Sequence, residues 1–339
     1  KIRTAHFMSN ILFKREFAAS TLELEAQSSK IWSVSFDPLG EFILVGTDQN
    51  ILILEGKTGA VLKSINEHNG KVYCVAFAPN GESFASGGAD NNVIIWNRNG
   101  SGILKYSHNH CIQYVQYNPV SHDLLSTTCN DFCVWNTKQN KRIYKTNIPS
   151  NCLSVDWAPN GKLFAMSLQN NSVQLHDKNG KLLHVMEHTD NHRNIVCCKW
   201  YDSDTLIFAS WTKLLSFYHI EYGAKDKKPK VKHVSTAKLD FYPNSLCVLK
   251  NSCLILSGLD NYLYLYTTRG AFIEKYKDVY GANKKEHQRD WILSVCNQEQ
   301  TKRFCYGTNH GYLVCNKIVF KTVHSLQDNL YAYRAANLC

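Results

Sequence analysis

Four segments of the chain repeat one pattern of apolar residues around a proline. They read VSFDPLGEF, VAFAPNGESF, VQYNPVSHDL and VDWAPNGKLF, and their prolines (Pro38, Pro79, Pro119 and Pro159) are 41, 40 and 40 residues apart. A period of about 40 to 45 residues is typical of one four-stranded blade of a β-propeller. Within each repeat, apolar positions alternate and turn residues recur, which favours antiparallel strands. The repeats therefore predict an all-β fold.

Three more divergent copies follow the four clear ones. They begin at Ile195, Ser245 and Trp291, which brings the number of units to seven between about residue 30 and residue 319. Seven blades of about 41 residues need about 287 residues, and this span holds them. We therefore predict one seven-bladed ring over residues 21–319, with a basic N-terminal extension at 1–20 and a tail at 320–339.

A ring of blades must be closed, because an unpaired sheet edge at the junction would otherwise be exposed. The segment from Thr21 to Ala26 (TLELEA) alternates apolar and polar residues directly before the first repeat and has no partner of its own. We predict that this segment is the N-terminal strand that closes the ring by joining the last blade.

The second repeat carries the most specific side-chain pattern. His68 precedes its first strand, Ser86 lies in the second strand, Asp90 lies in the next turn and Trp96 ends the third strand. These residues resemble the structural tetrad of WD-repeat proteins, because a buried indole N–H, hydroxyl and imidazole each need a hydrogen-bond partner. A hydrolase triad is disfavoured, since a nucleophilic serine needs exposure and this one lies inside a strand without a G-x-S-x-G turn.

Other repeats retain parts of the same pattern. Ser126, Asp131 and Trp135 follow His108 in the third repeat, and Asp260 lies in the corresponding turn of the sixth. Together with the period, these residues predict a seven-bladed WD-repeat β-propeller in which the tetrads outside the second blade are incomplete.

The sequence indicates no metal or cofactor site. The close cysteine pairs, Cys129 with Cys133 and Cys197 with Cys198, lack a second pair at the spacing of a zinc site, so buried strand cysteines are expected. Histidines 108, 110, 188 and 192 are expected to have capping or surface roles in loops. The chain also lacks a P-loop, an H-E-x-x-H motif and a glycine-rich dinucleotide-binding junction. We expect no cofactor.

The chain has 38 Lys and Arg against 28 Asp and Glu, a net charge of +10. Two basic segments, Ala224 to Lys232 and Lys284 to Arg289, lie where the repeat period predicts loops. Aromatic residues do not interleave with these charges, which disfavours nucleic acid as a partner. The segments are either solvated linkers or a contact with an acidic protein surface or anionic lipid head groups. The candidate contact residues are Lys225, Lys227, Lys228, Lys230, Lys232, Lys284 and Lys285.

Cysteine usage and hydropathy bear on the compartment. The chain has 13 cysteines, an odd number, mostly inside apolar strand-like runs where they behave as small hydrophobes. This pattern indicates a reducing compartment and therefore a cytoplasmic location. No apolar run approaches the roughly 18 residues that span a bilayer, so we do not expect an integral membrane protein. Residues 1–20 favour a short extension over a transit peptide.

Four ordered segments resemble the first propeller of the intraflagellar transport protein 122 family. They are residues 71–126 (beginning KVYCVAFAPNG), 204–220 (DTLIFASWTKLLSFYHI), 255–270 (ILSGLDNYLYLYTTRG) and 320–334 (FKTVHSLQDNLYAYR). The last segment is the most specific, since it resembles the passage out of that propeller. The resemblance covers roughly residues 30–335 and implies that residues 320–339 are an exit segment toward a second propeller.

The resemblance also implies a function. It is that of a non-enzymatic interaction scaffold in intraflagellar transport complex A, which supports retrograde ciliary transport and the ciliary entry of membrane proteins. The implied partners are other complex A subunits, a Tubby-like adaptor and membrane-protein cargo, with peripheral membrane contact. The implied location is the cilium or flagellum and the basal body.

Two other functions stay open at this point, because a fold does not fix a function. A coatomer-like WD-repeat subunit in vesicle trafficking would share the blade pattern. An enzyme with an active site in the central channel would need acidic or histidine side chains on the innermost strands. Those strands instead begin at the apolar or aromatic residues Trp32, Tyr73 and Ile112.

Overall fold

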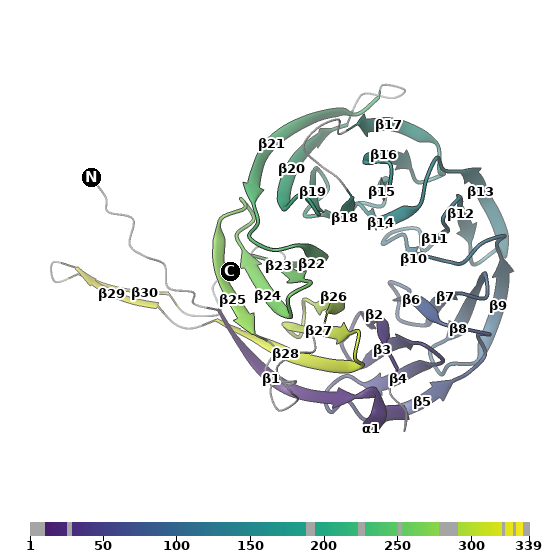
Figure 1. Ribbon diagram of the computed structural model, residues 1–339, viewed down its shortest axis with the longest axis horizontal. Coiled ribbons are helices and arrows are strands. Elements are labelled where there is room, and N and C mark those ends of the chain that lie inside the picture. Colours follow the sequence, from purple (N-terminus) through teal and green to yellow (C-terminus); the bar gives the residue numbers. More distant parts are fainter. Residues whose placement is uncertain are drawn as a thin grey trace.

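Seven four-stranded antiparallel sheets stand around a central channel like the blades of a wheel (Figure 1). The computed structural model describes residues 11–25, 29–187, 194–222, 228–249, 253–277, 291–320, 323–327 and 330–334. Within these ranges the backbone forms thirty strands and one short helix. In each of the first six blades the chain passes from an inner strand beside the channel to an outer strand at the rim. The predicted seven-bladed propeller is confirmed.

The blades follow one another in chain order, and their strands are given from inner to outer. Blades 1 and 2 consist of β2 (Ile31–Phe36), β3 (Phe42–Thr47), β4 (Ile51–Glu55), β5 (Val61–Ile65), β6 (Val72–Phe77), β7 (Ser83–Gly88), β8 (Asn92–Asn97) and β9 (Gly102–Ser107). Blades 3 and 4 consist of β10 (Tyr114–Tyr117), β11 (Leu124–Thr127), β12 (Asp131–Asn136), β13 (Lys141–Asn147), β14 (Cys152–Trp157), β15 (Leu163–Leu168), β16 (Ser172–Asp177) and β17 (Leu182–Glu187). Blades 5 and 6 consist of β18 (Ile195–Trp200), β19 (Thr205–Ser210), β20 (Leu214–Glu221), β21 (Lys230–Lys238), β22 (Pro243–Leu249), β23 (Cys253–Gly258), β24 (Tyr262–Tyr266) and β25 (Phe272–Lys277).

Blade 7 joins the two ends of the chain. Its inner three strands are β26 (Ile292–Gln298), β27 (Arg303–Thr308) and β28 (Tyr312–Phe320), and its outer strand is β1 (Ile11–Ser20). β1 runs antiparallel to β28, with Ser20 opposite Tyr312 and Phe13 opposite Ile318. Closure by an N-terminal strand is therefore confirmed, and the ring begins at residue 11, inside the segment predicted to be an extension.

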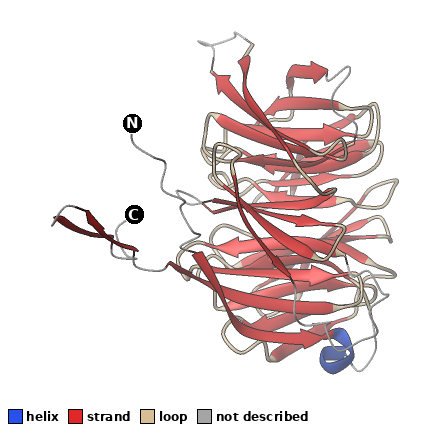
Figure 2. Ribbon diagram, turned by 60° about the vertical axis from the view of Figure 1, so that its left-hand side comes forward, coloured by secondary structure: helices blue, strands red, loops and turns tan. Residues whose placement is uncertain are grey.

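The prediction that the segment from Thr21 to Ala26 is the closing strand was wrong. Thr21–Glu25 forms the helix α1, visible at the edge of the ring in Figure 2, and Ala26 lies outside the described residues. The reason is a capping box: the Ser20 N–H donates to Glu23 Oε2 at 2.8 Å, and the Glu23 N–H donates to Ser20 Oγ at 3.3 Å. This reciprocal pair starts a helix, and it outweighs the apolar alternation of TLELEA.

The tail after the ring contains a separate hairpin. β28 extends to Phe320, and β29 (Val323–Gln327) then pairs antiparallel with β30 (Leu330–Arg334). That this segment leads toward a second propeller stays a prediction.

Every outer strand carries a β-bulge at the same place. In blades 1 to 6 one aliphatic residue of the outer strand has no partner in the pairing, and in β1 the unpaired residue is Glu16. The six aliphatic residues are Leu62, Ile103, Ile143, Leu183, Val234 and Ile273. Bulges increase the local twist and so blunt an edge against pairing with other chains.

The hydrophobic core consists of seven clusters, each lying between two neighbouring blades. Close approach of the blades depends on small residues in the second strand. A Cβ at Gly307 would overlap Ile31 of blade 1, and a Cβ at Gly87 would overlap Ile112 of blade 3. These glycines therefore allow the inner strand of the next blade to pack against the sheet.

Serine hydroxyls on the inner strands also join neighbouring blades. Each accepts a hydrogen bond from a backbone N–H of the next inner strand, at distances of 3.1 to 3.3 Å. The pairs, acceptor first, are Ser33 with Val75, Ser154 with Cys198, Ser245 with Val295, and Ser294 with Val34. These bonds fix the register between blades around the channel.

Candidate functional site

The four tetrad residues of blade 2 form one continuous hydrogen-bonded chain. His68 Nδ1 lies 2.9 Å from Asp90 Oδ1, and His68 Nε2 lies 2.7 Å from Ser86 Oγ. The Trp96 indole N–H donates to the same serine oxygen at 2.8 Å. With His68 donating to the carboxylate, its other nitrogen accepts the serine proton. The serine is fully buried, so the hydroxyl is committed to structure.

The charge of Asp90 fits this arrangement. Burial alone would raise the pKa of Asp90, but hydrogen bonds from Asn92 and His68 hold it below its ordinary value. The carboxylate also accepts the Asn69 backbone N–H at 3.2 Å. Asp90 therefore connects the tetrad to the loop before the first strand of blade 2.

Blade 3 contains a second complete tetrad, so the prediction that it is incomplete was wrong. His108 Nδ1 lies 2.9 Å from Asp131, and His108 Nε2 lies 2.8 Å from Ser126 Oγ. The Trp135 indole N–H donates to Ser126 at 2.9 Å. Lys145 adds an ion pair to Asp131 at 3.0 Å. Burial lowers the pKa of His108 despite the opposing charge of Asp131, which favours the neutral form of the imidazole.

Blades 4 and 6 replace the tetrad with other side chains. In blade 4, His176 stacks on Phe164 with ring centroids 5.0 Å apart, its Nδ1 bonds to the Gly180 carbonyl, and the Gln174 amide lies 3.1 Å from its Nε2. In blade 6, the carboxylate of Asp260 accepts the hydroxyl of Tyr264. These contacts satisfy polar groups by different pairings, near the turn after the third strand in blade 4 and in the turn before the third strand in blade 6.

The central channel is a cavity of about 750 Å³ lined by the inner strands of all seven blades. Among its described lining residues, charged side chains are confined to Asp156 and Lys199. Lys199 Nζ lies 2.7 Å from Asp156 Oδ1, which also accepts a hydrogen bond from Gln116 at 2.7 Å, and Trp200 N–H donates to Oδ2 at 2.9 Å. Burial would lower the pKa of Lys199, but the Asp156 carboxylate raises it.

This ion pair was not singled out from the sequence. Its signal is the alignment of inner strands, where Gln116, Asp156 and Lys199 occupy the same position in three consecutive blades. The two charges neutralise each other and are held by further hydrogen bonds, so the pair joins blades 4 and 5 rather than presenting a free acid or base.

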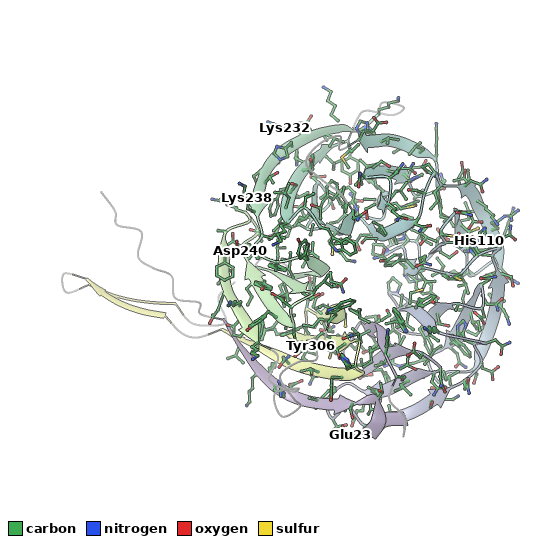
Figure 3. The ribbon with its side chains drawn as sticks, in the orientation of Figure 1. Glu23, His110, Lys232, Lys238, Asp240 and Tyr306 are labelled. Carbon is green, nitrogen blue, oxygen red and sulfur yellow. The ribbon has the colours of Figure 1, made fainter. Side chains whose placement is uncertain are left out.

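The predicted basic contact residues fall into two groups. Lys225, Lys227, Lys284 and Lys285 lie outside the described residues. Lys228, Lys230 and Lys232 are exposed. The prediction of a loop was wrong for Lys230 and Lys232, because β21 already pairs with β20 from Lys230 opposite Glu221 onward. Figure 3 places Lys232 at the outer edge of the ring.

The cysteines that the structure describes are free thiols, and most of them are buried. They include Cys129, Cys133, Cys197 and Cys198, the pairs considered for zinc. No cluster of metal-binding side chains occurs within the described ranges, and histidines 188 and 192 fall outside them. The described part of the chain also contains no helix with the length and hydrophobicity that a membrane crossing requires.

Comparison with known proteins gives one consistent result. The family model of the IFT122 first beta-propeller matches residues 30–317. The intraflagellar transport protein 122 homologues of Xenopus tropicalis and Danio rerio are each 30% identical over 310 residues, which cover 90% of this chain and 25% of theirs. The Homo sapiens homologue is 24% identical over 366 residues, covering 89% of this chain and 28% of its own. The chain thus spans about a quarter of the length of these relatives.

Proposed function

The chain belongs to the family of IFT122 first β-propellers, and from this premise we propose that it is a non-enzymatic protein-interaction scaffold of intraflagellar transport complex A. In this role it supports retrograde ciliary transport and the ciliary entry of membrane proteins. The observation that carries the proposal is the extent of the family match, which reaches from the first blade to the last, residues 30–317.

The side-chain chemistry of the ring supports a binding role. The tetrad serines, Ser86 and Ser126, are fully buried and hydrogen-bonded to an imidazole and an indole. The channel pair Asp156 and Lys199 is engaged within the wall. These polar groups hold the ring together, and a rigid ring offers two faces and a rim to partners.

The proposed partners are the other subunits of complex A, with a Tubby-like adaptor and membrane-protein cargo as further partners. The proposed location is the cytoplasm, at the cilium or flagellum and the basal body. The support for this assignment is the name shared by the curated relatives, intraflagellar transport protein 122 homolog.

Affinity purification from ciliated cells tests the proposal. The tagged full-length protein is expressed beside a matched version from which this propeller is deleted, and the eluates are compared by mass spectrometry. We expect complex A subunits with the full-length protein and a marked loss of at least one of them without the propeller. Coatomer subunits in the eluate and Golgi localisation would contradict the proposal and select a coatomer-like trafficking subunit. Equal recovery with and without the propeller would contradict its role as a scaffold.

A further inference from the structure

The outer strands of the seven blades carry almost all of the net charge of the chain. β1, β5, β9, β13, β17, β21 and β25 together contain 12 Lys and Arg and 3 Glu, a net charge of +9. The rest of the chain holds the remaining 26 Lys and Arg against 25 Asp and Glu. Lysines on edge strands protect against edge-to-edge pairing, so an evenly spread charge would need no further explanation.

The positive charge is not evenly spread: β13 of blade 3 and β21 of blade 5 contain three Lys or Arg each, and the turn before β17 adds two lysines on blade 4 between them. Eight cations lie in the turn before the outer strand, or in its first residues, in blades 3, 4 and 5. We call this group the cationic arc, and it consists of Lys138, Lys141, Arg142, Lys178, Lys181, Lys228, Lys230 and Lys232. Since all of these turns join a third strand to an outer strand, they lie at the same end of the ring.

The cations of the arc are exposed, and the described part of the chain gives them no ion pair, although Lys230 lies opposite Glu221 in the strand pairing. Each of the eight is exposed, and none forms an ion pair with any described residue. Two other cations near the rim differ in this respect, because Lys145 pairs with Asp131 and Arg98 pairs with Glu41. The arc therefore keeps its charge available for a partner.

The arc is continuous across blade boundaries. Figure 1 shows β13, β17 and β21 following one another along one sector of the rim, and Figure 3 places Lys232 on its outer edge. Burial lowers the pKa of His184 on β17, and the charge of Lys228 from blade 5 lowers it further. A cation of blade 5 thus acts on a side chain of blade 4.

Exposed apolar side chains lie among these cations. Ile143, Leu182 and Val234 are 39%, 46% and 59% exposed, and Ile143 and Val234 are the bulged residues of their strands. A partner that fits must therefore offer negative charges interspersed with apolar groups.

The shape of the arc distinguishes between two anionic partners. The cations follow the curve of the rim over three of the seven blades. A flat bilayer in contact with one outer strand would therefore be separated from the outer strands of the adjacent blades. At the same end, the turns nearer the axis in blades 3 and 5 carry Asp123, Asp202 and Asp204, which would repel an anionic surface laid across those blades. A flexible acidic chain can follow the curve and avoid these carboxylates.

We propose that the cationic arc binds an elongated acidic polypeptide segment with interspersed apolar side chains, which lies around the rim of blades 3 to 5. This inference rests on the proposed role of the propeller as a protein-binding scaffold and names the chemistry of one partner.

Direct binding to a defined probe tests the inference. The full chain is titrated into a labelled synthetic peptide of repeated Glu-Glu-Leu units, followed by fluorescence anisotropy, with a Gln-Gln-Leu peptide as the neutral control. The arc variant K141Q/K181Q/K230Q removes one cation from each blade. The matched variant K57Q/K105Q/K277Q removes the same charge from outer edges elsewhere on the ring. Thermal unfolding verifies that both variants fold.

We expect the Glu peptide to bind and the Gln peptide not to bind. The arc variant should bind the Glu peptide at least about tenfold more weakly, because it loses three exposed charge contacts and each of them contributes a modest share of the binding free energy. Binding should weaken further with salt, since the Debye length falls from about 10 Å at 0.1 M to about 3 Å at 1 M. The matched variant should bind within about twofold of the wild type.

Three results would overturn the inference. The first is that the wild type does not bind the Glu peptide, and the second is that both variants bind it equally more weakly than the wild type. The third is that the peptide does not bind, whereas the wild type and the matched variant sediment with phosphatidylserine vesicles and the arc variant does not. The last result would assign the arc to a membrane. Because the peptide assay needs no complex A subunit, its failure leaves the purification test of the proposed function intact.

Discussion

Arg303 and Glu16 form an ion pair across the blade that closes the ring, with 2.7 Å between Arg303 Nε and Glu16 Oε2. Glu16 is the bulged residue of β1, whereas Arg303 begins β27, with β28 between these strands. Arg303 Nη1 also donates to the carbonyl oxygens of Gly40 and Gly56 in blade 1, at 3.3 and 3.1 Å. One guanidinium therefore joins the N-terminal strand, the last blade and the first.

Replacing Arg303 with Met should destabilise the ring. The change leaves the Glu16 carboxylate, whose side chain is only 19% exposed, without its cation. Removing one partner of a buried pair typically costs about 3 kcal/mol of unfolding free energy. Urea denaturation followed by tryptophan fluorescence measures the loss. Glu16→Gln keeps an acceptor for Arg303 and should cost less, and an Arg303→Met variant within about 1 kcal/mol of the wild type would contradict this role of the pair.

Removing residues 1–20 should prevent stable closure. Without β1, the long strand β28 presents an unpaired edge, which promotes association with other chains. We expect aggregation or a markedly lower Tm, measured by size-exclusion chromatography and thermal unfolding. A truncation of residues 1–10, which keeps β1 whole, is the matched control. A monomeric 21–339 fragment with an unchanged Tm would show that closure does not need β1.

The sequence predicted the parts of the fold that depend on local pattern. Repeat spacing and apolar alternation placed seven blades along the chain, because each blade needs the same alternation. The closing strand was missed since the bulge at Glu16 interrupts the alternation of β1, while the capped helix after Ser20 imitates a strand.

The side-chain networks were harder to predict because they cross strands and blades. Asp131 follows Ser126 by five positions in blade 3, whereas Asp90 follows Ser86 by four positions in blade 2. Because of this one-residue difference in the turn, the sequence does not show that both blades form the same set of tetrad hydrogen bonds. The Asp156–Lys199 pair joins two blades and depends on the register between their inner strands. The repeat alignment places the two residues at the same position of neighbouring blades, but it does not show that they pair, because the register between blades follows from packing.

Replacing Ser86 with Ala should cost more stability than its size suggests. The change leaves the Trp96 indole N–H and the His68 Nε2 buried without a partner. An unsatisfied buried polar group costs about 1 to 3 kcal/mol, so we expect about 2 kcal/mol or more in chemical denaturation. Ser167→Ala in blade 4 is the matched control, because this equally buried hydroxyl makes one bond of 3.4 Å to the Ser154 carbonyl. Equal losses in the two variants would contradict a special role for the tetrad.

Burial of His176 should make the ring sensitive to mild acid. Burial lowers its pKa from 6.5 to about 4, although the Gly180 carbonyl and the charge of Asp177 oppose the shift. Between pH 6.5 and about 4, the unfolded chain therefore binds a proton at this histidine and the folded chain does not. The unfolding free energy falls as the pH falls through this window. Lowering the pKa from 6.5 to about 4 corresponds to roughly 3 kcal/mol of unfolding free energy. This contribution is present above pH 6.5 and is lost by about pH 4.

The variant His176→Gln isolates this contribution from the carboxylates that titrate in the same window. Gln keeps a polar group beside Gln174 and the Gly180 carbonyl but binds no proton, so its unfolding free energy should fall less steeply with acid than that of the wild type. Urea denaturation at several pH values between 7 and 4 measures both slopes, and His110→Gln controls for the loss of an exposed imidazole. Because the wild type alone carries the buried imidazole, the stability difference between wild type and His176→Gln must shrink toward low pH. Parallel profiles would show that His176 is protonated equally well in the folded and unfolded chain, which its burial between Phe164 and Phe132 argues against.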